Sequence, residues 1–112
     1  MTAPGDRDIR CLALGPLATN CYLLGSAGHW VVVDPSLEPE PLLAACEQDG
    51  IVPEAIWLTH AHGDHIAGIG DLRKAFPQIE VLCPEAEAGM FDDPQRNLSA
   101  IVGLSIRVAP PD

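Results

Sequence analysis

Apolar residues gather in short runs along the chain, and turn-forming residues separate these runs. Residues 9–14 (IRCLAL) and 20–24 (NCYLL) lie on either side of the turn-rich sequence GPLAT, so they predict two strands joined by a turn. Residues 30–33 (WVVV) are continuously apolar, which is typical of a strand that is buried on both faces. We expect this strand to end at Asp34 and Pro35.

The middle of the chain predicts two helices with a strand between them. Residues 39–49 predict a helix, because Pro41 lies in its first turn and Gly50 ends it. Residues 55–59 (AIWLT) predict another buried strand. Asp64 is a typical capping residue for a second helix that ends before Pro77. The apolar residues of this helix recur at roughly helical spacing: Ile66, Ile69, Leu72 and Phe76.

The last third of the chain predicts shorter elements. Residues 80–83 predict a strand, 85–91 a short helix, and 105–109 (SIRVA) a final strand. The early strands are joined by turns, whereas the later ones are separated by helices. This order predicts an α/β fold with a mixed sheet. A length of 112 residues fits a single domain, residues 1–112.

Composition and charge narrow the classes of function. Sixteen acidic residues against six basic ones give a net charge of −10, so we expect no binding to nucleic acid. No apolar run approaches about 20 residues, so we expect no membrane span. The cysteines form no CxxC pair, which predicts reduced thiols in a cytoplasmic protein. They are Cys11, Cys21, Cys46 and Cys83.

Candidate chemistry concentrates in the stretch THAHGDHIAG, which holds three of the four histidines and an aspartate within six positions. His60 and His62 follow a predicted strand, and residues two apart in extended backbone point to the same side, so both could reach one ion. Asp64 and His65 follow across Gly63, which permits a tight turn, so they could bind a second ion. Imidazole and carboxylate ligands suit zinc, and also iron or manganese.

This stretch resembles the HxHxDH signature of the metallo-β-lactamase superfamily. Three further segments resemble its glyoxalase II-like branch: residues 16–25 (PLATNCYLLG), 30–36 (WVVVDPS) and 92–100 (DDPQRNLSA). The resemblance extends from about Ile9 onward. It implies the N-terminal half of an αββα sandwich, truncated before the second half of the fold.

The resemblance also implies roles for individual residues. His60 and His62 would bind the first metal, and Asp64 and His65 the second, with Asp64 also a catalytic residue. Asp34 would accept a hydrogen bond from an imidazole and so orient it, although an Asx turn before a proline is equally typical of this position. The cofactor would be two zinc ions, with iron or manganese as alternatives. A metal-activated water would attack the carbonyl of a small-molecule thioester or ester-like substrate.

The pattern departs from the family after His65, because no further histidine follows, whereas the family's second half supplies more ligands. A strand of five residues spans about 16 Å, so we expect His29 at the opposite end of the sheet, exposed in a turn. Cys83 could reach the site if strands 55–59 and 80–83 are parallel, but a buried structural thiol is the favoured interpretation.

A half-sandwich would expose an apolar sheet face, which predicts either aggregation or a homodimer that pairs two half-sheets.

Three hypotheses for function result. The first is a metal-dependent hydrolase whose site is incomplete in this chain. The second is a non-catalytic metal-binding or oligomerising fragment of such a hydrolase. The third, an amidohydrolase barrel that uses its HxH pair, is disfavoured, because that fold needs roughly 200 residues or more and three strands precede the pair here.

Overall fold

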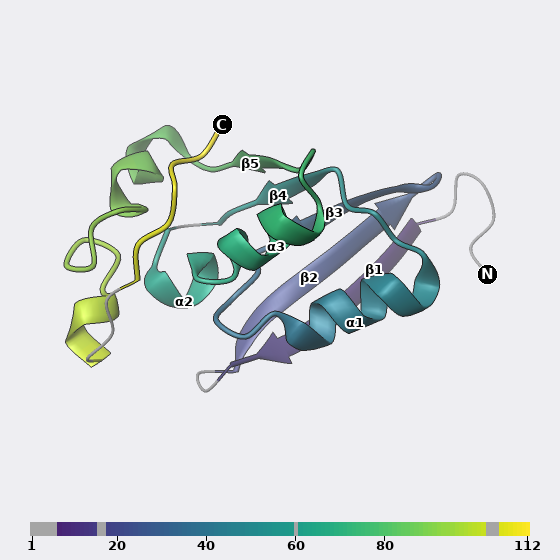
Figure 1. Ribbon diagram of the computed structural model, residues 1–112, viewed down its shortest axis with the longest axis horizontal. Coiled ribbons are helices and arrows are strands. Elements are labelled where there is room, and N and C mark those ends of the chain that lie inside the picture. Colours follow the sequence, from purple (N-terminus) through teal and green to yellow (C-terminus); the bar gives the residue numbers. More distant parts are fainter. Residues whose placement is uncertain (1–6, 16–17, 60, 103–105) are drawn as a thin grey trace.

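In the part of the chain that the structure describes, five strands form one mixed sheet, ordered β1 to β5 as in the sequence (Figure 1). The computed structural model describes residues 7–15, 18–59, 61–102 and 106–112. Antiparallel pairs join the first three strands, and parallel pairs add the last two. The strands are β1 (Arg7–Leu14), β2 (Thr19–Ser26), β3 (His29–Val33), β4 (Ala55–Trp57) and β5 (Glu80–Leu82). The predicted mixed α/β sheet is therefore confirmed.

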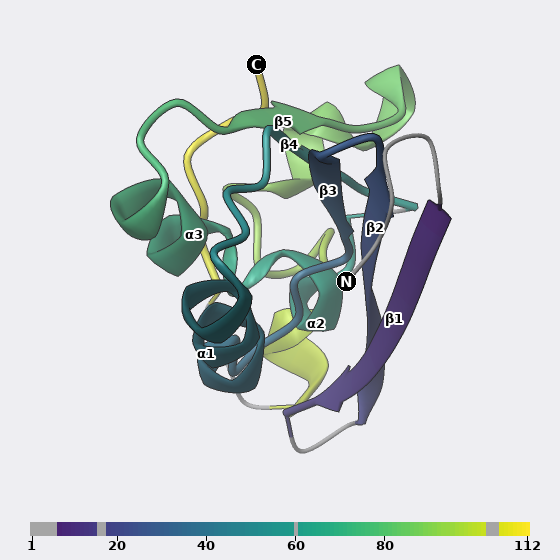
Figure 2. The ribbon, with the colours of Figure 1, turned by 90° about the vertical axis from the view of Figure 1, so that its right-hand side faces the viewer.

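Helices make the connections between the parallel strands, and Figure 2 shows α1 and α3 on the same side of the sheet. Gly50 ends α1 with a left-handed φ of 64°, a conformation that glycine adopts without steric cost. Two 3-10 segments follow β5. The helical elements are α1 (Glu40–Asp49), α2 (Gly63–Ile66), α3 (Ile69–Ala75), η1 (Glu85–Met90) and η2 (Ser99–Val102). No described helix is both long enough and apolar enough to cross a membrane.

The core lies between the sheet and the helices. Strands β2 to β5 each direct alternate side chains to this side, and the helices contribute apolar residues opposite them. Burying each of these larger aliphatic side chains contributes about 1.5–3 kcal/mol. The fully buried members of this cluster include Leu23, Val32, Ile56, Val81, Leu42, Ile69 and Leu72.

The opposite face of the sheet is apolar and open to solvent. The strand register places Tyr22 beside Val33, Val33 beside Trp57, and Trp57 beside Leu82. Trp57 is 47% exposed and Leu82 44% exposed. The sequence predicted that residues 30–33 would be buried on both faces, and this was wrong, because only Val32 among them is fully buried. We call this surface the outer face.

Three further predictions about the elements need correction. The strand predicted at 105–109 does not form over residues 106–109, which run as irregular chain bonded to Ser99 and Phe91. The single helix expected after Asp64 is divided into α2 and α3. The helix predicted at 85–91 is a 3-10 segment.

Candidate metal centre

Strands β3 and β4 are parallel, so their carboxyl ends meet at one edge of the sheet. Asp34 follows β3 directly, and its backbone amide donates a hydrogen bond to the carbonyl of Trp57 at the end of β4. Its carboxylate accepts two hydrogen bonds from Thr59, one from the backbone amide at 2.9 Å and one from the hydroxyl at 2.6 Å. Asp34 thus joins the ends of the two strands.

The same carboxylate contacts His65, which lies in α2. Oδ2 of Asp34 lies 3.0 Å from Nδ1 of His65, and the two side chains are only 5% and 17% exposed. Burial raises the pKa of Asp34, but the His65 ring and the hydroxyl and amide of Thr59 together lower it by more, so the pKa lies below its usual range. The carboxylate is therefore ionised at neutral pH.

A carboxylate that is ionised can only accept, so its contact favours the His65 tautomer with the hydrogen on Nδ1. Such a ring directs Nε2 to the side away from Asp34. This arrangement of carboxylate and imidazole is the usual one for histidines that bind metal ions. The local donor chemistry therefore fits a divalent metal.

His62 lies where the backbone changes from extended to helical. Its φ of −65° and ψ of 147° are extended, and α2 begins at the next residue, Gly63. The backbone amide of His65 donates to the carbonyl of His62 at 2.9 Å, so one turn of chain separates the two imidazoles. We call residues 61–66 the metal turn.

The metal turn corrects the prediction that Asp64 caps a helix. The residue before α2 is His62, and Asp64 lies inside the helix. His60 and the side chain of Asp64 are outside the described residues. Among the side chains that are described, no group of three or more potential ligands gathers. The assignment of His60, His62, Asp64 and His65 as metal ligands therefore stays a prediction.

The segment after β3 holds the metal turn through its backbone. The amide of Ser36 donates to the carbonyl of His65 at 3.2 Å, and the amide of Gly68 donates to the carbonyl of Ser36. Asp34 and Ser36 have positive φ angles of 55° and 70°, in the region that non-glycine residues rarely occupy. Backbone strain of this kind is concentrated at functional sites, where surrounding contacts hold it in place.

On its other side the metal turn contacts two buried residues that the sequence did not single out individually, Asn97 and Ser99. The amide of Gly63 donates to the carbonyl of Asn97 at 2.7 Å. Both residues belong to the segment 92–100 (DDPQRNLSA), whose family resemblance was the signal that could have identified them.

The remaining histidine lies far along the sheet from the metal turn. His29 begins β3, whereas Asp34 follows its end, and the His29 side chain is 73% exposed and pairs with Glu54. Cys83 is half-buried, and its thiol donates to the carbonyl of Pro84 at 3.4 Å. Burial and the nearby Glu87 raise the pKa of the Cys83 thiol, which disfavours the thiolate that a metal would need.

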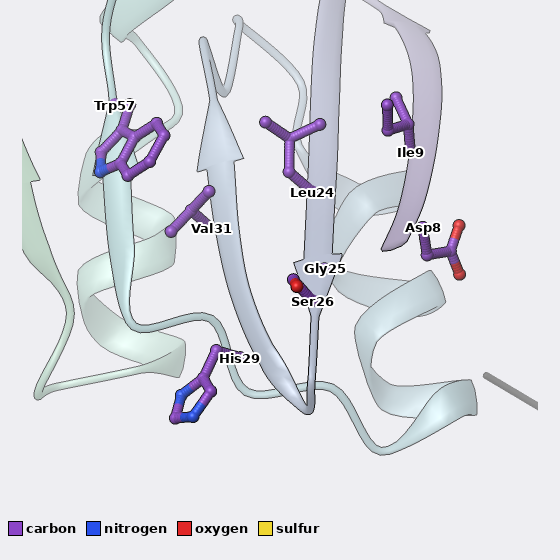
Figure 3. Close-up of a pocket in the computed structure, with 8 residues that line it drawn as sticks. All are labelled: Asp8, Ile9, Leu24, Gly25, Ser26, His29, Val31 and Trp57. Carbon is purple, nitrogen blue, oxygen red and sulfur yellow. The ribbon is translucent and has the colours of Figure 1, made fainter. Parts of the chain in front are cut away.

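A shallow hollow of about 300 Å³ lies on the outer face, near the His29 end of the sheet (Figure 3). Apolar side chains from neighbouring strands form its floor, among them Ile9, Leu24, Val31 and Trp57. Residues of the metal turn do not line it. The hollow is therefore a feature of the exposed sheet and separate from the candidate metal centre.

Comparisons with known proteins agree with this fold. The family model of the metallo-β-lactamase superfamily matches residues 14–111. The chain therefore belongs to the metallo-β-lactamase superfamily.

One curated protein and two solved structures illustrate the similarity. A hydroxyacylglutathione hydrolase of Xanthomonas euvesicatoria pv. vesicatoria (strain 85-10) is 43% identical over 65 residues, which are 58% of this chain and 25% of that protein. The crystal structure of BLEG-1 B3 metallo-β-lactamase has a TM-score of 0.84 and 33% identity, covering 93% of this chain and 50% of that one. The structure of TTHA1623 in a di-iron-bound form has a TM-score of 0.77 and 34% identity, covering 92% and 52%.

The chain thus spans about half of the two solved structures, and its match to the curated relative covers a quarter of that protein. This coverage fits the predicted N-terminal part of a metallo-β-lactamase domain.

Proposed function

We propose that this chain carries the metal-binding half of a metal-dependent hydrolase that acts on the thioester or ester-like carbonyl of a small molecule. The contact between Asp34 and His65 is the observation that carries the proposal, because it orients an imidazole of the HxHxDH stretch as metal-bound histidines are oriented. The similarity to a hydroxyacylglutathione hydrolase supports the thioester class.

The proposed cofactor is a pair of zinc ions, with iron or manganese as alternatives. His60 and His62 would hold one ion, and Asp64 and His65 the other, with Asp64 also serving in catalysis. The di-iron form of TTHA1623 supports a site for two metals. When bound, such metals lower the pKa of a bound water to about 7 and polarise a carbonyl group.

The described residues supply orientation for this chemistry. Thr59 holds the Asp34 carboxylate through two hydrogen bonds, and the carboxylate holds Nδ1 of His65. Both groups are largely buried, so water competes little for these contacts. The contact therefore favours one orientation of the imidazole in the metal-free chain.

A second candidate function is a fragment that binds metal or oligomerises without catalysis. The coverage of only 50% of BLEG-1 and the open outer face favour it. The two candidates differ in one measurable property, because the fragment takes up metal without turning over a thioester. We propose a cytoplasmic setting for either one, supported by four cysteines that are all in the free thiol form.

Hydrolysis of a hydroxyacylglutathione thioester, measured with added Zn²⁺, Fe²⁺ or Mn²⁺, tests the first candidate. Turnover by this chain would support the hydrolase, and His62→Ala and His65→Ala should then abolish it while His29→Ala leaves it intact. The His29→Ala variant is the matched control, because it removes an imidazole at the opposite end of β3. Metal uptake without any turnover would reject the hydrolase and support the fragment.

A further inference from the structure

Gly63 begins α2, so its backbone amide has no acceptor within the helix. The carbonyl of Asn97 accepts a hydrogen bond from this amide at 2.7 Å. Gly63 lies between His62, proposed for the first metal, and Asp64 and His65, proposed for the second. The Asn97 carbonyl therefore binds the metal turn at Gly63, the residue between the proposed ligands of the first metal and those of the second.

The contact at Gly63 is too close for any side chain. A Cβ atom placed there would lie 2.9 Å from Cβ of Ser99 and 3.1 Å from Cδ1 of Ile106. Cβ atoms almost never approach a neighbour within 3.0 Å, so a side chain would have to displace the segment. The sequence therefore needs glycine at this position because Ser99 and Ile106 pack directly on the turn.

The side chain of Asn97 fixes that segment in turn. It is fully buried, and its amide group donates to the carbonyls of Met90 at 3.0 Å and Ile106 at 2.9 Å. Its carbonyl oxygen accepts from the backbone amide of Ser99 at 3.1 Å. One side chain thus joins Met90, Ser99 and Ile106, and the backbone carbonyl of Asn97 accepts the hydrogen bond from Gly63.

We propose that Asn97 is a positioning residue for the metal centre, which sets the geometry of the metal turn through Gly63 without touching a metal itself. The inference rests on the proposed metal binding. The turn is then held from two sides, by Asp34 and Ser36 at the end of β3 and by Asn97 across from them. We expect the loss of either side to change the spacing of the proposed ligands.

Two variants test this role against a merely structural one. Asn97→Ala removes all three side-chain bonds, and Asn97→Asp replaces the two donors with an acceptor. Leu42→Ala is the control for a general loss of stability, because Leu42 is fully buried on α1 and donates no hydrogen bond to the metal turn through its side chain. The readouts are hydrogen exchange of residues 61–68 in the metal-free chain, Zn²⁺ affinity, and the visible spectrum of the Co²⁺-loaded protein.

We expect both Asn97 variants to raise exchange in the turn, weaken Zn²⁺ binding by about tenfold or more, and change the Co²⁺ spectrum. Leu42→Ala should lower the melting temperature and leave the other readouts unchanged. Wild-type affinity and spectrum in a folded Asn97→Ala would overturn the inference while leaving the proposed function intact. A wild-type chain that binds no metal would overturn the proposed function, and the metal role of Asn97 with it.

A second pair of variants applies if both Asn97 changes prevent folding. Gly63→Ala should displace the packed segment and weaken Zn²⁺ binding, and Ser99→Gly removes the nearest atom that the new Cβ would meet. The double variant should therefore bind Zn²⁺ more tightly than Gly63→Ala alone. Unchanged binding in Gly63→Ala, or no recovery in the double variant, would contradict the inference.

Discussion

Oδ2 of Asp34 lies 3.0 Å from Nδ1 of His65, so the end of β3 and the helix α2 meet at one buried carboxylate. Thr59, which follows β4, donates twice to the same group. Three segments that are distant in the sequence therefore depend on one side chain, which makes Asp34 the first residue to test.

Asp34→Asn should weaken Zn²⁺ binding by about 10–100-fold and lower the free energy of unfolding by about 1–3 kcal/mol. The amide keeps an acceptor for the Thr59 backbone, but its NH₂ group cannot accept from the Thr59 hydroxyl or from His65. Zinc titration and urea denaturation measure the two effects. Asp49→Asn is the control, since Asp49 forms an exposed pair with Arg10 worth at most about 1 kcal/mol. Equal effects of the two variants would contradict this role for Asp34.

Two glycines near the metal turn should respond to alanine in opposite ways. A Cβ at Gly68 would lie 2.9 Å from the Ser36 carbonyl oxygen, so Gly68→Ala should destabilise the chain by about 1–3 kcal/mol. A Cβ at Gly70, inside α3, would meet nothing within 4 Å, so Gly70→Ala should stabilise it by about 0.5–1 kcal/mol. Denaturation curves decide this, and a neutral Gly68→Ala would show that the Ser36 contact is loose.

The cysteines should differ in reactivity with a thiol reagent at pH 8. Burial raises the pKa of Cys21 to about 12, so roughly one thiol in ten thousand is ionised at this pH. The pKa of an unfolded thiol is about 8.5, so unfolding should release this protection. Cys11 is exposed and should be labelled in the native chain. Mass spectrometry locates the label, and rapid native labelling of Cys21 would contradict the described packing of β2.

The homodimer expected from the sequence stays a prediction, and the outer face supplies the surface for it. Sedimentation velocity at micromolar concentration should find a dimer for the wild-type chain and a monomer for Trp57→Lys. Val52→Lys is the matched control, because Val52 is 68% exposed but lies in the connection before β4. A monomeric wild-type chain would rule out the dimer.

Much of the fold could be predicted because local patterns and sheet topology agree. Turns between the early strands gave antiparallel pairs, and helices between the later ones gave parallel pairs. The segment WVVV gave a wrong prediction, because four apolar residues in a row indicate a strand that is buried on both faces of the sheet. In the structure only Val32 is fully buried, since the described part of the chain places its helices on one side of the sheet.

Other predictions failed because tertiary contacts decided the local structure. The alternation in SIRVA predicts a strand, but the described part of this segment is held by Asn97, Ser99 and Arg73 instead of by a neighbouring strand. The helix expected after an Asp64 cap begins two residues earlier, at Gly63, whose amide donates to the Asn97 carbonyl. The HxHxDH motif could locate the candidate ligands. It could not identify Asn97, which binds their turn through the backbone of Gly63.

Metal content per folded chain tests the central claim most directly. Chain stripped of metal, reloaded with Zn²⁺ and desalted should retain about one to two zinc ions by elemental analysis. His29→Ala should retain the same amount, whereas His62→Ala and His65→Ala should lose most of it while keeping their secondary structure. Equal zinc in all four proteins, or none in a folded wild-type chain, would contradict a metal centre at residues 60–65.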